Sequence, residues 1–149
     1  MLQSAFHIDP KIVTNLELQA QVKAKISLNS LTLVDGKYYL ENWEIWKQII
    51  ETDWTDQKKY LTDRYDCDNF AYSFAARMSE IYGLNAGIIQ GWVYDKDTGK
   101  QISGHFWNVI LTKEGKLYFY EPMNDNYIEA RTNVVMGKWR YQCATARFI

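Results

Sequence analysis

The sequence has few prolines, glycines and cysteines and no long apolar run, and each shortage argues against a class of protein. Only 2 prolines and 8 glycines occur among 149 residues, which excludes a linker or low-complexity chain. With 2 cysteines, neither in a CxxC pair, and 2 histidines, the residues argue against a disulfide framework and a zinc site. No apolar stretch approaches the ~20 residues of a membrane span, and residues 1–10 lack the pattern of a signal peptide. We therefore expect a cytoplasmic protein without a membrane segment.

The charge is nearly balanced and the composition is that of an ordinary globular protein. Lys and Arg total 17 against 18 Asp and Glu, a formal charge of −1, which argues against nucleic acid or an anionic membrane as a partner. Hydrophobic residues make up 47% and charged residues 23%, so we predict a single domain over residues 1–149. Aromatic residues are abundant, at 15%. They mostly serve packing, but exposed Trp and Tyr also form sites for peptides and sugars.

Turn residues and apolar spacing predict the secondary structure. In the first half we expect a helix or strands at residues 11–25, a hairpin of residues 31–34 and 38–40 around Asp35-Gly36, a helix from Asn42 to Ile50, and a short helix at residues 56–61. In the second half we expect strands at Gly87–Tyr94, His105–Thr112, Lys116–Glu121 and Ala144–Ile149. Helices first and strands later predict an α+β fold with an antiparallel sheet.

Cys67 stands at the predicted start of a helix. Apolar residues recur with helical spacing from Phe70 to Ile81 and stop at Gly83, so the helix begins at or just after Cys67. Unpaired N–H groups and the positive end of the helix dipole favour an anion there, which is typical of a nucleophilic thiolate. The flanking Asp66 and Asp68 oppose that charge unless they are solvated or paired.

His105 and Glu121 are predicted to lie together on adjacent strands. A three-residue loop at residues 113–115 pairs Thr112 with Lys116 and makes His105 and Glu121 diagonal neighbours on one face. That face also carries Trp107, Val109, Leu111, Leu117 and Phe119, and we expect it to pack on the Cys67 helix. A two-residue loop would send Glu121 to the other face, but it gives a less uniformly apolar pairing. In the first register, Glu121 would orient His105 as the acid of a triad does.

Three motifs resemble a known family. They are Asp66-Cys67-Asp68-Asn69-Phe70-Ala71, Gly104-His105-Phe106-Trp107-Asn108 and Tyr118-Phe119-Tyr120-Glu121-Pro122, and they resemble the papain-like cysteine peptidase domain at the C-terminus of a mushroom agglutinin, with relatives in bacterial and phage proteins. The resemblance implies a papain-like or transglutaminase-like fold, with the cysteine-bearing helix on an antiparallel sheet. It makes Cys67 the nucleophile, His105 the general base and acid, and Glu121 the orienting residue. It also implies calcium dependence, for which Asp66 and Asp68 are the candidate ligands.

The chain departs from that family in two places. Met123-Asn124 stands where members often have Gln after the Glu-Pro pair, and residues 61–66 contain no oxyanion glutamine, Gln57 being the nearest. The agglutinin's sugar-binding β-trefoil has no counterpart in the sequence, so glycan binding is not inherited with the resemblance.

The leading hypothesis is a cysteine hydrolase, peptidase-like, or an acyltransferase that works through a Cys67–His105–Glu121 triad and an acyl-enzyme. Trp92, Trp107 and Asn108 are the candidate substrate-binding residues, and a peptide or protein is the expected substrate. The alternative is a non-catalytic protein- or peptide-binding module on the same fold.

Overall fold

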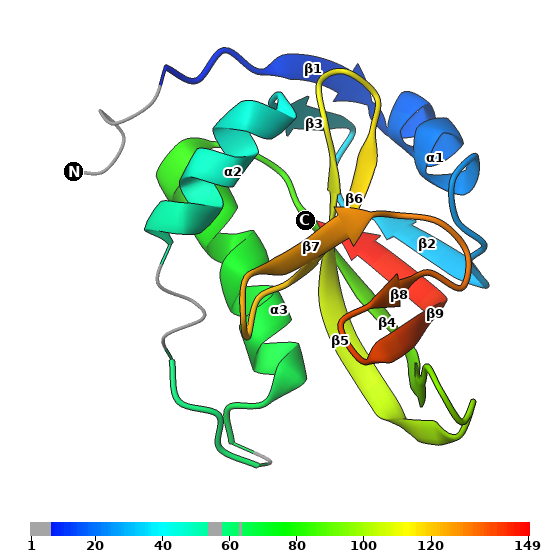
Figure 1. The fold of residues 1–149 in the computed structure, drawn as a ribbon. Coiled ribbons are helices and arrows are strands. Elements are labelled where there is room, and N and C mark those ends of the chain that lie inside the picture. The colour runs from blue at the N-terminus through cyan, green and yellow to red at the C-terminus, as the bar shows by residue number, and fades with distance from the viewer. Residues whose placement is uncertain (1–6, 54–57, 63) are drawn as a thin grey trace.

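A computed structural model describes residues 7–53, 58–62 and 64–149, and Figure 1 shows its fold. The elements in chain order are β1 (Lys11–Thr14), α1 (Asn15–Lys23), β2 (Ser30–Leu33), β3 (Lys37–Leu40), α2 (Trp43–Thr52), α3 (Cys67–Arg77), the π-helical turn η3 (Met78–Tyr82), β4 (Gly87–Asp95), β5 (Gln101–Leu111), β6 (Leu117–Glu121), β7 (Asn126–Glu129), β8 (Val135–Met136) and β9 (Trp139–Phe148). The molecule is mostly sheet with short helices.

The main sheet has the strand order β2-β9-β4-β5-β6-β7, with β8 paired to β9. All its neighbours are antiparallel except β2, which pairs in parallel with β9. The sheet is therefore mixed, and the predicted antiparallel sheet is corrected in this respect.

The predicted hairpin of residues 31–34 and 38–40 is wrong in its pairing, although both strands exist. β2 joins β9 of the main sheet, whereas β3 pairs with β1 in a separate two-stranded sheet. Each strand gains an apolar partner in this way: Tyr38 and Leu40 of β3 become fully buried. Burial of these side chains outweighs the local preference of Asp35-Gly36 for a tight hairpin turn.

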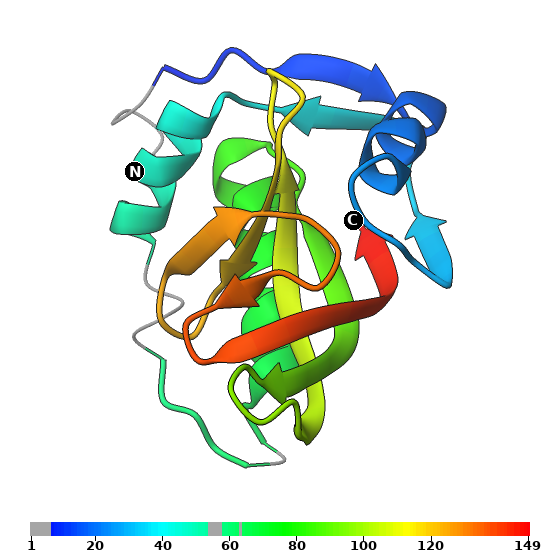
Figure 2. The same cartoon turned by 45° about the vertical axis from the view of Figure 1, so that its right-hand side comes forward.

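Two apolar cores lie on opposite faces of the sheet because side chains alternate along each strand. One face packs on α1 through Leu18 and Val22. The other face packs on α2 and α3, which lie together on one side of the sheet in Figures 1 and 2. On β5, Val109 belongs to the first core and Ile110 to the second. The face predicted to lie on the Cys67 helix is the first one, so that packing prediction is wrong.

The helix predictions are mostly confirmed. The Asn42 side chain caps α2 by accepting the backbone N–H of Ile45 at 3.0 Å. α3 begins at Cys67, and its continuation η3 ends at Gly83, whose φ of 66° is the left-handed conformation that glycine allows. The 11–25 segment is first a strand and then a helix. For the expected short helix at 56–61, positions 56–57 lie outside the described residues, and none of 58–61 is helical.

No helix in the described part of the chain is both long and apolar enough to span a membrane. The cytoplasmic location stays a prediction.

Candidate functional site

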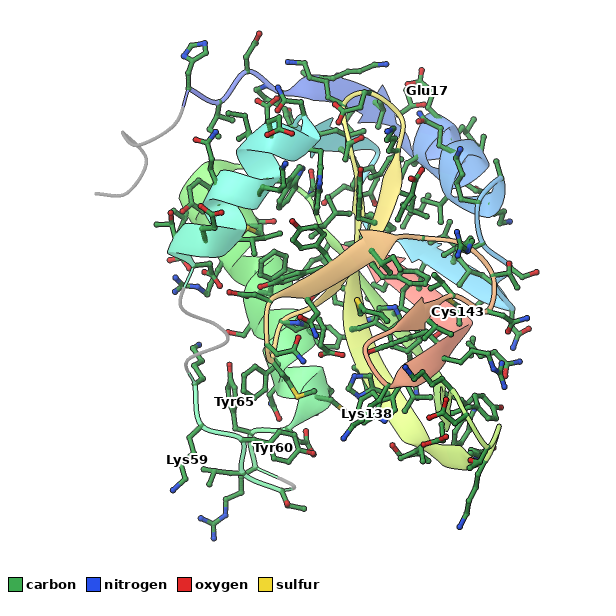
Figure 3. The ribbon with its side chains drawn as sticks, in the orientation of Figure 1. Glu17, Lys59, Tyr60, Tyr65, Lys138 and Cys143 are labelled. Carbon is green, nitrogen blue, oxygen red and sulfur yellow. The ribbon has the colours of Figure 1, made fainter. Side chains whose placement is uncertain are left out.

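Cys67 occupies the first residue of α3, as its sequence predicts. Just before the helix, Leu61 and Tyr65 exchange reciprocal backbone hydrogen bonds of 2.7 Å. The Asp66 N–H then donates to the Asn69 side chain at 3.2 Å, which holds the start of the helix in place. Tyr65 lies beside this end of α3 in Figure 3. The thiol is half-buried and forms no disulfide.

His105 and Glu121 form a buried pair in the strands next to this helix end. His105 Nε2 lies 2.7 Å from Glu121 Oε2, and the two residues are only 4% and 1% exposed. The predicted register is confirmed, because Leu111 opposes Leu117 and Asn108 opposes Tyr120. The β5–β6 pairing stops at Asn108, so the β5 edge is open toward His105.

The positive charge of His105 is stabilised by its neighbours. Burial disfavours the imidazolium, but the hydrogen bonds to the Cys67 side chain and to Glu121 outweigh it and raise the pKa of His105 to about 9. At neutral pH the ring is therefore a cation between a sulfur and a carboxylate. The structure thus brings Cys67, His105 and Glu121 together, and their catalytic role stays a prediction.

Tyr141 and Trp139 of β9 complete the surroundings of His105. The Tyr141 hydroxyl donates to Glu121 Oε2 at 3.1 Å, and burial followed by the Glu121 charge raises the pKa of Tyr141, so it remains a donor. The Trp139 ring meets the His105 ring edge-on, with centroids 5.3 Å apart. Sequence analysis missed both residues because it started the last strand at Ala144. The alternation of Trp139, Tyr141 and Cys143 is the signal that would have extended it.

Of the three predicted substrate-binding residues, Trp107 lies beside His105, whereas Trp92 and Asn108 do not. Trp107 is fully buried and stacks beneath His105 with a centroid distance of 5.9 Å. Asn108 is also fully buried, whereas Trp92 is 44% exposed. Trp92 shares its face of β4 with Ile88 of the second core, opposite to the face that carries His105. Trp107 thus supports His105 from below, while Trp92 and Asn108 do not join it.

The Asn108 side chain links α3 to the sheet through hydrogen bonds. Its Nδ2 donates to the carbonyl oxygens of Ala71 at 2.8 Å and Gly87 at 3.1 Å. We expect Asn108→Ala to lower the free energy of unfolding by about 1–3 kcal/mol, since it removes a buried donor from two carbonyls. Urea unfolding measures this, with the exposed Asn124→Ala as the matched control at within about 0.5 kcal/mol of wild type. Equal losses in the two variants contradict the assignment.

The candidate calcium ligands form a pair of carboxyls. A hydrogen bond between Asp66 and Asp68 raises the pKa of Asp68. Among the described residues, no group of three or more His, Cys, Asp or Glu is placed to hold a metal ion. Calcium binding therefore stays a prediction from the resemblance.

Cys143 is the second thiol of the chain, and Gln57 is the glutamine nearest to Cys67 on its N-terminal side. Burial raises the pKa of Cys143 to about 12, so this thiol is protonated at neutral pH and unreactive. Gln57 lies outside the described residues.

Comparison with known proteins identifies the family. Residues 10–136 match the ricin-type beta-trefoil lectin C-terminal domain. The chain belongs to this family. The lectin-related part of the resemblance is confirmed. No curated protein sequence matches the chain.

Two solved lectin structures share the fold of this family member. PSL1a, in a complex with E64, has a TM-score of 0.65 at 21% identity over 91% of this chain and 51% of that one. Polyporus squamosus lectin, bound to the human-type influenza-binding epitope Neu5Aca2-6Galb1-4GlcNAc, has a TM-score of 0.65 at 18% identity over 91% and 49%. The lectin C-terminal domain described here thus spans about half the length of either lectin.

These comparisons correct the predicted fold class and function. The family and Polyporus squamosus lectin are described as lectins, and both solved structures share this fold. These findings overturn the papain-like or transglutaminase-like fold, the cysteine hydrolase or acyltransferase, and the peptidase part of the resemblance. The physical reason is that three short motifs constrain one end of a helix and two strands, and the same local arrangement occurs on different folds with different functions. The comparisons favour the alternative, a non-catalytic binding module.

Proposed function

We propose that this lectin C-terminal domain is a non-catalytic module that binds peptide-like ligands at the Cys67–His105–Glu121 row. The observation that carries the proposal is the buried ring of His105, which is hydrogen-bonded to the Cys67 side chain and lies 2.7 Å from Glu121 Oε2. A cysteine side chain within hydrogen-bond reach of a histidine is the arrangement typical of a group that reacts with electrophilic ligands.

The charge at the start of α3 supports binding without turnover. Acyl transfer needs free N–H donors for the oxyanion that forms on the carbonyl. Here the hydrogen-bonded carboxyls of Asp66 and Asp68 form an acidic pair at the start of α3, the end of the helix where that oxyanion would form. A bound carbonyl group therefore gains little stabilisation as it becomes tetrahedral.

The two solved structures with a similar fold support both the position of the binding site and the assignment of a binding function. PSL1a is seen in a complex with E64, so a protein of this fold holds that compound. Polyporus squamosus lectin is seen with a glycan, which is consistent with a chain whose relatives serve binding. Because the chain spans about half of each lectin, we limit the proposal to the site that this half contains.

Labelling with E64 tests the site. E64 carries an epoxide, and a thiolate opens it: the S–C bond forms, one epoxide C–O bond breaks, and the oxygen takes a proton, here from His105. We expect one adduct per chain at neutral pH, located at Cys67 by mass spectrometry of peptides. Cys67→Ala abolishes the adduct and His105→Ala slows its formation.

Cys143→Ala is the matched control for this experiment. Its thiol has a pKa raised to about 12 by burial, so removing it leaves the labelling unchanged. No adduct, or an adduct at Cys143, contradicts the proposed site. Cleavage of a fluorogenic peptide mixture that disappears in Cys67→Ala contradicts the absence of turnover.

A further inference from the structure

A cavity of about 330 Å³ lies next to the His105–Glu121 pair. Its walls come from the β6–β7 turn and the β8–β9 turn, and its lining residues include Glu121, Met123, Asn126, Met136, Lys138 and Trp139. Figure 3 places Lys138 at the second of these turns. The volume is at the small end of the ~300–1,000 Å³ typical of ligand pockets, so it suits a single side chain of a ligand.

One wall of this cavity holds a carboxylate oxygen without a partner. Glu121 lines the cavity and is 1% exposed. Its Oε2 accepts from His105 at 2.7 Å and from the Tyr141 hydroxyl at 3.1 Å. Its Oε1 is buried and has no hydrogen-bond partner among the described residues. Because a buried acceptor left unpaired destabilises a protein, a donor brought by a ligand would be bound favourably there.

The number of unpaired acceptors limits which donor fits. Among the described residues that line the cavity, Glu121 Oε1 is the one buried side-chain acceptor without a partner. A lysine ammonium carries three donor hydrogens and an arginine guanidinium five, so either group would bury N–H donors that find no acceptor. A hydroxyl donates a single hydrogen, which matches the single oxygen.

The other walls favour an aromatic ring. Met123 and Met136 both line the cavity, and thioethers make favourable contacts with aromatic rings. Trp139 is a further wall, and its edge-on contact with His105, at a centroid distance of 5.3 Å, holds its ring in place. A serine or threonine hydroxyl stands on a short side chain that would leave most of the volume empty. The phenol of tyrosine combines an aromatic ring with one O–H at its tip.

The cavity lies within reach of a ligand at Cys67. His105 is hydrogen-bonded to the Cys67 side chain and lies 2.7 Å from Glu121 Oε2, so only the imidazole ring stands between the thiol and the carboxylate that lines the cavity. A peptide-like ligand at Cys67 can therefore place a neighbouring side chain past His105 and into the cavity.

We propose that the cavity beside Glu121 is the specificity pocket of the Cys67–His105–Glu121 row and that it holds a tyrosine side chain of the bound peptide. The phenol O–H donates to Glu121 Oε1, and the ring lies against Trp139 and the two methionine thioethers. This inference rests on the proposed function and adds to it the side chain that the ligand must carry. A phenylalanine in the same place leaves the buried oxygen unpaired, so its peptide binds more weakly.

The experiment is a titration of the full chain with N-acetyl-tyrosine amide and, as its matched analogue without the hydroxyl, N-acetyl-phenylalanine amide, followed by two-dimensional NMR. We expect the tyrosine derivative to bind with a Kd of about 1 mM and to shift the amides of the β6–β7 and β8–β9 turns. The phenylalanine derivative should bind at least about tenfold more weakly, roughly 1.4 kcal/mol.

Variants separate the hydroxyl contact from the ring contacts. Glu121→Gln should reduce the preference for tyrosine, because a neutral amide oxygen is a weaker acceptor than a carboxylate. Trp139→Ala and Met123→Ala should weaken the binding of both derivatives a few-fold, since they remove contacts with the ring. Trp92→Ala, an exposed Trp on the other face, leaves both Kd values unchanged. If Trp139→Ala does not fold, Met123→Ala tests the ring contacts, because its side chain is only half-buried.

The outcomes separate this proposal from the proposed function. Equal binding of the two derivatives, or tighter binding of N-acetyl-lysine amide than of either, overturns the assignment of the pocket. If neither derivative shifts the turns at about 10 mM, well above the expected Kd, while E64 still labels Cys67, the pocket is refuted and the proposed function stands. If tyrosine is preferred but E64 leaves Cys67 unlabelled, the proposed function fails and the cavity is a tyrosine site unconnected with Cys67.

Discussion

Raising the pH from 6.5 to 9 should lower the free energy of unfolding by about 3 kcal/mol. The pKa of His105 is raised from 6.5 in the unfolded chain to about 9 in the folded one, so the folded state binds more protons in that window. The stabilisation is fully present below pH 6.5 and is lost as the pH rises through 9, at about 1.4 kcal/mol for each pH unit between the two pKa values. His105 is 4% exposed, so solvent does little to screen it.

Urea unfolding at a series of pH values measures this slope, and NMR titration of the ring locates the pKa itself. His105→Gln should flatten the profile in this window. Glu121→Gln should lower the pKa of His105, because burial then acts with less opposition. His7→Gln is the control, since His7 is the only other histidine and is exposed. A wild-type profile as flat as that of His105→Gln refutes the charged state assigned to this ring.

Gly91→Ala should be among the most destabilising single substitutions, with a loss of roughly 3 kcal/mol. Gly91 lies in β4 between β5 and β9, opposite His105 and Cys143. A Cβ at this position would stand 2.1 Å from the carbonyl oxygen of Gln142 and 2.8 Å from the Trp107 ring. β9 must move away or Trp107 must shift beneath His105, so both stability and the His105 site are affected.

Gly104→Ala is the matched control on the neighbouring strand β5. A Cβ at Gly104 would meet Trp92 at 3.6 Å, an ordinary contact, so we expect a change within about 0.5 kcal/mol. Chemical denaturation compares the two variants, and E64 labelling reports on the site. A Gly91→Ala protein as stable as Gly104→Ala would show that β4 and β9 tolerate a side chain between them.

The local features of the site could be predicted from the sequence because each depends on neighbours along the chain. Gly83 and the apolar stripe before it place Cys67 at the start of α3. The three-residue turn before Lys116 sets the β5–β6 register, which brings His105 and Glu121 together. Hairpin register and helix ends follow from turn conformation and side-chain period, which act over a few residues.

The family and its function could not be derived from those local features. The motifs around Cys67, His105 and Glu121 led to a hydrolase, whereas the matched family is a lectin domain. Short motifs describe a site and not the fold that carries it.

The sequence by itself determined where the helix with Cys67 begins, how β5 and β6 align, and that an acid would stand beside His105. Only the tertiary structure decided that β2 joins β9 in parallel and that Tyr141 and Trp139 of β9 enclose the pair. It also decided that the body of α3 packs in the second core while Cys67 at its start reaches His105. These features depend on which apolar surfaces meet across long separations in the chain. That choice is made by total burial, and no local pattern encodes it.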